Sequence, residues 1–289
     1  MDTFQTQVTK QLERLQSKSL REIEKAVTEK RLKWWSDHEQ LKKDRPITPR
    51  KAFETLFFDY MGLDKNDLPI LSESEEEITW ASQNPCPTLT ACQQLNLDTR
   101  RVCRKAYEKS TQVFISQMDP ELRFVRSYEE IRPHAAICRE SIIRFDFEKA
   151  MRLAISEAQV SRQEGNKGYG AILWFGGKVL AAAHDTAGTE KDPSLHAEVN
   201  AIRQACRILG DANLCGAVLV STCEPCPMCS SLAVWANITT LVYGASIKET
   251  AAPGRERILV DSAEIIAQSP VQIEVVPGVL REDCLKFYM

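Results

Sequence analysis

Most of the information about the fold lies in two short stretches, LHAEVNAI at residues 195–202 and TCEPCPMC at residues 222–229. In the first stretch, apolar side chains recur at helical spacing, which predicts a helix over 195–209 with Ser194 as its N-cap. The second stretch leads into a predicted helix over 227–236. Two helices that begin at one face of a sheet can bring their first residues to a common site.

These two helix starts carry a candidate zinc site made of His196, Cys226 and Cys229. Pro227 suits a first helical position, and the cysteines, three residues apart, then lie on one side of the first turn, where the helix dipole favours thiolates. Three protein ligands leave a fourth position for water, which is the catalytic zinc pattern. Glu198 is about 200° round the helix from His196, so we expect it to carry protons for that water instead of binding metal.

The region around these stretches alternates helices and strands, which predicts a sheet covered on both faces. A Gly176-Gly177 turn separates two strand-like runs and indicates a hairpin. The expected elements outside the two stretches are a helix at 147–163, strands at 169–175, 178–183, 217–221, 239–244 and 271–276, and helices at 260–268 and 280–287.

The first half of the chain is expected to be mainly helical. Apolar residues recur every three or four positions through residues 1–61, which predicts a helical arm. Residues 1–51 hold 13 basic and 8 acidic side chains, which we interpret as a solvated charged face in preference to a nucleic-acid site. Residues 62–145 are interpreted as a linker, 62–84, followed by a cysteine-containing helical region, and residues 146–289 as the zinc domain.

Four further cysteines stand before the zinc domain. Cys86, Cys92, Cys103 and Cys138 could hold a second metal ion or an iron–sulfur cluster, with His134 four residues before Cys138 on an expected helix. Their spacing matches no known ligand pattern, so buried thiols are the alternative.

The motif H-x-E…P-C-x-x-C is the signature of zinc deaminases. At His196–Ile202 and Thr222–Cys229 the chain resembles the cytidine deaminase-like superfamily, in particular its branch of bacterial guanine deaminases and tRNA adenosine deaminases. The resemblance covers about residues 147–250. It implies an α/β fold, a three-layer αβα sandwich of about five strands, one Zn²⁺ per chain and commonly a homodimer.

The resemblance also implies substrate contacts at Asp185, Ala197 and Tyr169. Eleven residues before the histidine ligand such enzymes usually have an asparagine, where this chain has Asp185. An amide both donates and accepts hydrogen bonds, whereas an ionised aspartate only accepts. Asp185 therefore favours a substrate face with N–H donors, or is itself protonated. The C-terminal pocket residues of purine-deaminating relatives have no clear counterpart at Ala252–Arg257.

Charge and hydropathy set the expected partners. The net charge is −3, and residues 146–289 hold 13 basic against 17 acidic side chains, which disfavours a polyanionic nucleic-acid substrate. The longest apolar runs are too short to span a membrane, and the first residues lack a signal or transit pattern, so a cytoplasmic location is expected.

Three functions remain open at this point. The first is hydrolytic deamination of a base, nucleoside or related small heterocycle, with water as co-substrate. The second is tRNA adenosine deamination, with the basic arm as an RNA grip. The third is a catalytically idle zinc-containing regulatory or interaction protein, which the presence of Glu198 and an open metal position argue against.

Overall fold

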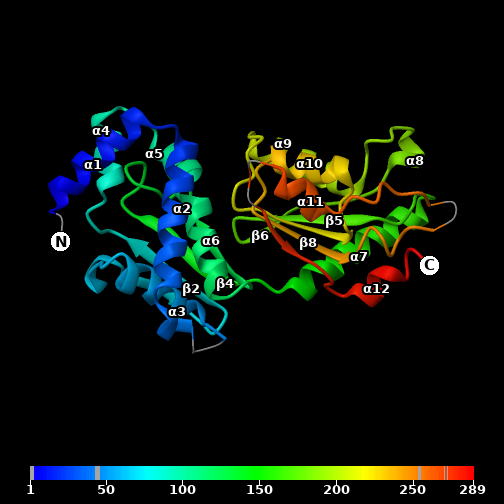
Figure 1. Cartoon of the computed structure of the whole chain (residues 1–289), viewed down its shortest axis with the longest axis horizontal. Helices are drawn as coiled ribbons and strands as arrows, with labels where there is room; N and C mark the ends of the chain where they lie inside the picture. The colour runs from blue at the N-terminus through cyan, green and yellow to red at the C-terminus, as the bar shows by residue number, and fades with distance from the viewer. Residues whose placement is uncertain (1–2, 43–45, 253–254, 270, 272) are drawn as a thin grey trace. The chain divides into compact units, whose positions relative to one another are not determined.

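The structure is a computed structural model that describes residues 3–42, 46–252, 255–269, 271 and 273–289 (Figure 1). The chain divides into two units, Met1–Phe145 and Asp146–Met289. Each unit has its own sheet and its own helices.

The C-terminal unit is built on a five-stranded sheet of order β6-β5-β7-β8-β9. Its elements are α7 (Phe147–Gln163), β5 (Gly170–Phe175), β6 (Lys178–His184), α8 (Ala187–Glu190), α9 (Ala197–Leu209), β7 (Val218–Cys223), α10 (Pro227–Trp235), β8 (Thr240–Ala245), α11 (Ser262–Ala267), β9 (Glu274–Val276) and α12 (Arg281–Leu285). β5 pairs antiparallel with β6 and β7, whereas β7, β8 and β9 run parallel. Figure 1 shows α9, α10 and α11 on one side of the sheet, with α7 and α12 on the other. The predicted αβα sandwich is confirmed.

Two features of the sequence explain this sheet. All six residues of β7 are buried, as expected for a central strand that is covered on both faces. Gly170 lets α7 pack directly on β5, because a Cβ atom there would overlap backbone atoms of Ala154 and Ala158. The sheet and α7 therefore hold the ends of β7 and β8 in defined positions.

The predicted elements of this unit agree with the structure, with small corrections at their ends. Helix α9 begins at Ala197, so His196 and not Ser194 is its N-cap. Ser194 instead donates through its hydroxyl to Asp192 Oδ1 at 2.7 Å. The short helix α8 was not predicted, and residue 272 of the predicted strand 271–276 lies outside the described residues.

The N-terminal unit combines helices with a four-stranded antiparallel sheet of order β1-β2-β4-β3. Its elements are α1 (Phe4–Ser17), α2 (Leu20–Ser36), a 3₁₀ turn (Glu39–Lys42), α3 (Pro49–Glu54), a π-helical turn (Thr55–Tyr60), a 3₁₀ turn (Lys65–Asp67), β1 (Ile70–Glu73), β2 (Glu77–Ser82), α4 (Pro87–Gln94), α5 (Thr99–Cys103), a π-helical turn (Arg104–Glu108), α6 (Lys109–Met118), β3 (Leu122–Arg126) and β4 (Cys138–Arg144).

This sheet corrects the sequence interpretation of residues 62–145. The expected linker 62–84 contains β1 and β2, and the expected helical region ends in β3 and β4. His134 lies in a turn and Cys138 begins β4, so the two do not share a helix. Most of the described residues of the predicted arm are helical, and Ser19 and Glu22 form a capping box at the start of α2; residues 1–2 and 43–45 lie outside the described residues.

The core of the N-terminal unit joins the sheet to the helices around Trp80. This side chain is fully buried, lies 4.8 Å from the Phe53 ring and 5.1 Å from the Phe57 ring, and donates from its indole N–H to Glu140. Aromatic residues of this size supply much of the apolar area buried in a small unit. Residues 1–145 therefore have a hydrophobic core of their own.

Candidate metal centre and active site

Two helix N-termini bring the three predicted zinc ligands together. His196 is the N-cap residue of α9, and Cys226 is the N-cap residue of α10. Pro227 occupies the first turn of α10, and Cys229 follows on the same side of that turn. β7 ends at Cys223 and leads directly into this segment. The helix starts thus place one imidazole and two thiols at one site.

The distances between the ligand atoms fit a tetrahedral zinc ion. Cys226 Sγ is 3.7 Å from Cys229 Sγ and 3.7 Å from His196 Nδ1, and Cys229 Sγ is 3.6 Å from His196 Nδ1. Zinc–sulfur and zinc–nitrogen bonds of about 2.3 and 2.1 Å at tetrahedral angles require separations of about 3.8 Å for S···S and about 3.6 Å for S···N. Among the described residues, only this group brings three potential ligand atoms within 4.8 Å of one another.

The ionisation of one ligand favours metal binding. Contact with the Cys229 thiol and with His196 lowers the pKa of Cys226 to about 4, and the same contact between the two thiols raises the pKa of Cys229. A cysteine must be a thiolate to bind zinc, so Cys226 is already in the required form, whereas Cys229 has to lose its proton when the metal binds.

Glu198 lies beside the ligand group and is buried. Its Oε2 atom is 3.5 Å from Cys229 Sγ, and its Oε1 atom accepts a hydrogen bond of 2.9 Å from the Ser221 hydroxyl. Burial, and then the charge of Cys226, raise the pKa of the Glu198 carboxyl above its ordinary value. The side chain is thus held next to the metal position, in surroundings where a carboxyl group can hold a proton.

A second buried carboxylate, Glu224, was not identified from the sequence as part of the site. Its Oε2 accepts from the backbone N–H of Ile247 at 2.9 Å, and its Oε1 accepts from the backbone N–H and the hydroxyl of Ser262 at 2.8 and 2.9 Å. Glu224 therefore ties the segment that carries Cys226 to the loop after β8 and to the start of α11. Its position between two cysteines was the available signal, but its partners lie 23 and 38 residues away.

The three predicted substrate contacts occupy different surroundings. Asp185 is 2% exposed, accepts from the Ala187 N–H at 3.3 Å, and has a raised pKa because of its burial, which His196 opposes. Ala197 is fully buried in the first turn of α9. The Tyr169 ring stacks on Tyr288 with centroids 5.1 Å apart. Asp185 thus has an electrostatic link to the ligand group, whereas Tyr169 packs against the end of the chain.

Tyr288 and Arg257 complete this C-terminal cluster. The Tyr288 hydroxyl lies 2.7 Å from Thr222 Oγ1, which also contacts Gly170 of β5. The Arg257 guanidinium lies over the Tyr169 ring, 4.8 Å from its centroid, and donates to the Tyr169 hydroxyl. Tyr288 thus connects the end of the chain to β7 and to Tyr169.

The four cysteines of the N-terminal unit do not come together as a close ligand group among the described residues. Cys86, Cys92, Cys103 and Cys138 form no group of three close ligand atoms within the described chain. Cys86 Sγ accepts from the Leu89 N–H and caps α4, and burial raises the pKa of Cys103 to about 12. Cys86 and Cys103 thus take part in local structure as protonated thiols, and a second metal or iron–sulfur site stays a prediction.

Cys223, next to the metal ligands, is also a buried neighbour and not a ligand. It is 4% exposed, and its Sγ lies 3.5 Å from Thr250 Oγ1. Burial raises its pKa well above the ordinary range of a thiol, so it stays protonated.

Comparisons with known proteins agree with this geometry. Residues 145–245 match the zinc-binding region of cytidine and deoxycytidylate deaminases. The chain is 37% identical over 134 residues to the tRNA-specific adenosine deaminase of Bacillus subtilis (strain 168), which covers 46% of this chain and 81% of that protein. The chain belongs to the cytidine deaminase-like superfamily. The predicted superfamily is therefore confirmed, as is the class of enzyme, a hydrolase of C–N bonds with a zinc-binding deaminase domain.

Further relatives of this deaminase domain differ in substrate. The guanine deaminase of Bacillus subtilis (strain 168) is 38% identical over 86 residues, which is 30% of this chain and 55% of that protein. A solved structure of a tRNA:A34 deaminase is 29% identical, with a TM-score of 0.43, and the alignment covers 48% of this chain and 98% of that one. Within the described residues, no helix combines the length and the apolar character that crossing a membrane requires.

Proposed function

We propose that the protein is a zinc-dependent hydrolytic deaminase that releases ammonia from a purine- or pyrimidine-like base, a nucleoside or a related small heterocycle. The observation that carries this proposal is the buried carboxylate of Glu198, 3.5 Å from Cys229 Sγ, beside three side chains spaced for tetrahedral zinc. A structural zinc knuckle needs neither this carboxylate nor an open fourth position.

The chain's own residues divide the work as follows. His196, Cys226 and Cys229 would hold Zn²⁺, which when bound supplies Lewis-acid activation of a water molecule. Glu198 takes a proton from the attacking water and delivers it to the ring nitrogen as the new C–O bond forms. It then passes the hydroxyl proton to the amine, the C–N bond breaks, and the products are a ring carbonyl and ammonia. The Ser221 hydroxyl holds one oxygen of Glu198 and leaves the other, Oε2, directed at the ligand group.

Substrate recognition is the less constrained part of the proposal. Asp185 is buried and interacts electrostatically with His196, so it is the candidate for gripping the substrate ring. Its raised pKa favours the protonated alternative, in which the carboxyl group can donate as well as accept. Asp185→Asn would then change the preference among bases more than it lowers the maximum rate. Ala197 would line the pocket by shape only, and Tyr169 would support it from the C-terminal cluster.

The test is an ammonia-release screen of zinc-loaded protein over bases, nucleosides and nucleotides. Glu198→Gln should lower the rate on the best substrate by at least about 100-fold, because general acid–base catalysis supplies about 10²–10⁴-fold. Zinc content, measured by atomic emission, should remain near one per chain. Glu190→Gln, which alters an exposed carboxylate of the same unit, is the matched control and should leave the rate unchanged. An unchanged rate in Glu198→Gln, or loss of its zinc, contradicts the assigned role.

A second candidate is tRNA adenosine deamination, which the similarity to the Bacillus subtilis tRNA-specific adenosine deaminase favours. It predicts inosine formation in a tRNA anticodon stem-loop and binding that weakens steeply as salt increases, because phosphate contacts release counterions. Deamination of a free base or nucleoside, with RNA binding that is absent or insensitive to salt, selects the first candidate. Failure of both screens with zinc still bound would revive the idle regulatory protein. A homodimer and a cytoplasmic location stay predictions, which sedimentation and cell fractionation can test.

A further inference from the structure

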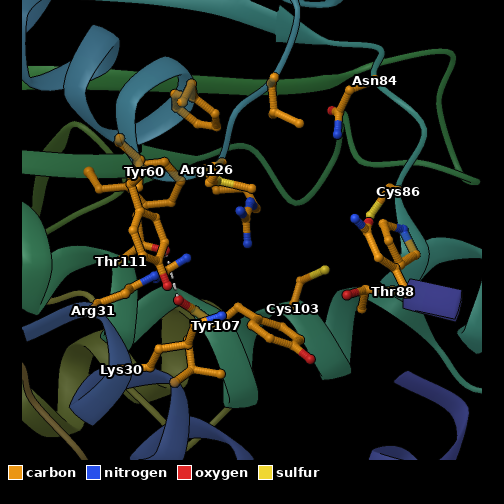
Figure 2. A pocket seen from close by; sticks show the side chains of 18 of the residues that line it. Lys30, Arg31, Tyr60, Asn84, Cys86, Thr88, Cys103, Tyr107, Thr111 and Arg126 are labelled. Atoms are coloured by element: carbon orange, nitrogen blue, oxygen red, sulfur yellow. Dashed lines mark hydrogen bonds between the residues drawn. The ribbon is translucent and has the colours of Figure 1, made fainter. Parts of the chain in front are cut away.

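The N-terminal unit contains a cavity whose wall chemistry is unrelated to the zinc site. The cavity has a volume of about 430 Å³, within the range of small-molecule sites. Every residue that lines it lies between Gln7 and Arg126, so it belongs wholly to this unit. Figure 2 shows the Arg126 guanidinium projecting into the middle of this space, with Arg31 and Tyr60 to one side and Cys86 and Cys103 to the other.

The cavity is rich in positive charge. Four cationic side chains line it: Arg14, Lys30, Arg31 and Arg126. Its lining, all of which lies within the described residues, includes no aspartate or glutamate. The two cysteines that line it do not balance these charges, because burial raises the pKa of both thiols, that of Cys103 to about 12.

Arg31 is a buried cation without a counter-ion among the described residues. It is 7% exposed, and its Nη1 atom donates to the hydroxyls of Ser110 and Thr111 at 2.9 and 2.7 Å. Its Nε–H is buried and has no partner in the described chain. Burial lowers the pKa of Arg31 to about 10, and Arg126 contributes to this shift through like-charge repulsion. An unpaired buried cation is costly, which calls for an anion in the space that it faces.

Arg126 is held in a fixed orientation by Glu140. Its Nε donates to Glu140 Oε1 at 2.7 Å and its Nη2 lies 2.5 Å from the same oxygen. Glu140 Oε2 is in turn held by Ser82 Oγ at 2.7 Å and Trp80 Nε1 at 3.2 Å. The remaining Nη1 atom of Arg126 is buried with no hydrogen-bond partner among the described residues. One N–H edge of a pre-oriented guanidinium is therefore left free to donate hydrogen bonds. This arrangement suits recognition of a carboxylate or a phosphate.

Much of the remaining wall is apolar and partly aromatic. The side chains that provide them are Ala26, Val27, Leu56, Phe57, Tyr60, Met61, Leu63 and Phe124. The Arg31 guanidinium lies over the Tyr60 ring, 5.9 Å from its centroid, and the Arg126 guanidinium lies over the Phe124 ring at 5.1 Å. The cations thus share the cavity with apolar walls, a combination that inorganic anions alone do not require.

We propose that this cavity binds a small organic anion, whose carboxylate or phosphate accepts hydrogen bonds from Arg31 Nε and Arg126 Nη1 while its apolar, planar body packs against Tyr60, Phe57 and Phe124. This site is separate from the proposed deaminase chemistry and does not depend on it. The same head-group chemistry could belong to a carboxylic acid or to a phosphate ester, which the probes below distinguish.

The test is isothermal titration calorimetry of the full-length, zinc-loaded protein with matched pairs of probes. The anionic probes are 1-naphthaleneacetate and 1-naphthyl phosphate, the neutral partners are 1-naphthaleneacetamide and 1-naphthol, and inorganic phosphate reports on the head group alone. We expect at least one naphthyl anion to bind at least about ten-fold more tightly than its neutral partner, because hydrogen bonds between charged groups are worth about a factor of ten or more. Whichever anion binds more tightly identifies the head group.

Arg31→Met is the decisive variant, because it removes the charge at nearly constant volume. It should weaken anion binding at least about ten-fold while leaving the melting temperature unchanged or raised, since a buried cation without a counter-ion is removed. Arg50→Met removes an exposed cation of the same unit and should leave binding unchanged. Arg126 is not substituted, because its loss would leave Glu140 unpaired.

Several results would overturn the proposal. These are equal binding of anions and neutral partners, no binding of either naphthyl anion, and binding that survives Arg31→Met. A large fall in the melting temperature of Arg31→Met would assign Arg31 a purely structural role and would also overturn it. Binding of an RNA oligonucleotide without binding of the naphthyl anions would replace it with a nucleic-acid surface.

Discussion

The carboxylate of Glu224 offers a sharp test of how the zinc ligands are held in place. It accepts three hydrogen bonds, from the N–H of Ile247 and from the N–H and hydroxyl of Ser262, and it is only 4% exposed. The perturbation is Glu224→Ala, with Glu224→Gln as the graded variant. Both act two residues before Cys226, the N-cap of α10.

The magnitude follows from these bonds. A hydrogen bond to a charged group contributes about 1.5–3 kcal/mol, and a buried donor left unpaired costs about 1–3 kcal/mol. Because the three bonds share one carboxylate, they do not add fully, so Glu224→Ala should lower the free energy of unfolding by about 3–5 kcal/mol. In Glu224→Gln the amide oxygen can still accept from Ser262, but its NH₂ faces the Ile247 N–H. The expected loss is then about 1–2 kcal/mol.

The assay must report on the C-terminal unit alone, because a chain of two compact units need not unfold in a single two-state step. Chemical denaturation followed by hydrogen-exchange mass spectrometry reports the C-terminal unit through peptides from β8 and α11. Zinc affinity, measured by competition with a chelator, should fall by about 10–100-fold in Glu224→Ala, as for other residues that support metal ligands. Glu264→Gln changes an exposed carboxylate of α11 and serves as the control.

The reasoning fails if Glu224→Ala changes the free energy of unfolding by less than about 1 kcal/mol. A second contradicting result is unchanged zinc affinity together with faster hydrogen exchange in the peptides around residues 247 and 262. The hydrogen bonds of Glu224 would then hold these segments without holding the zinc ligands in place. An equal effect of Glu264→Gln would show that net charge and not the buried bonds is responsible.

Three further predictions concern the same unit. Burial lowers the pKa of His184, but its hydrogen bonds to Glu157 and Glu164 raise it more. The stabilisation by protonated His184 is therefore complete below pH about 6.5 and is lost as the pH rises through the raised pKa. His184→Gln should remove this pH dependence of the free energy of unfolding, which denaturation curves at several pH values can measure. Gly170→Ala should cost at least about 3 kcal/mol or prevent folding, because its Cβ would overlap backbone atoms of α7, and thermal denaturation tests this. Cys226→Ser should reduce zinc content from about one per chain to near zero, and chelation should lower the melting temperature of the parent protein but not of this variant.

The zinc site was predictable because its geometry is local to two helix starts. Cys226 is the N-cap of α10 and Pro227 and Cys229 lie in its first turn, while His196 is the N-cap of α9 and Glu198 lies in its first turn. Helix geometry then fixes their directions almost without tertiary information. That the two turns meet at one site depends on the sheet between them. The alternation of strands and helices in the sequence predicts this sheet.

The strands of the N-terminal unit were missed for physical reasons. Every residue of β1 (Ile70–Glu73) is exposed, and β2 (Glu77–Ser82) has five buried residues in succession, so neither strand shows period-two alternation. The acidic run that joins the two strands, residues 73–77, forms the surface turn of a hairpin. In the sequence, such a run is equally typical of a linker. A segment as short as Leu122–Arg126, with three apolar side chains and two arginines, does not distinguish a strand from a helix until its partners are known.

The basic side chains of the first helices show what charge counts leave open. The excess of cations in residues 1–51 was interpreted as a solvated face, yet Arg31 is buried and unpaired on its Nε atom. An arginine on an amphipathic helix looks the same in sequence whether its head group reaches water or an interior cavity. The structure distinguishes the two cases, because Arg31 lines an interior cavity. Arg126 of β3, about a hundred residues later in the chain, lines the same cavity.

A buried Arg31 cation without a counter-ion lowers stability unless something binds it, and the neighbouring Arg126, although paired with Glu140, keeps one N–H group without a partner in the described chain; together these features favour a binding site over a packing defect. A protein optimised for stability alone would replace Arg31 with an apolar residue of similar volume. If Arg31→Met raises the melting temperature and abolishes anion binding, this unit trades stability for a binding site, as functional sites commonly do. If the variant is less stable and binding persists, the hydrogen bonds to Ser110 and Thr111 are the reason for this arginine, and the cavity is a by-product of packing.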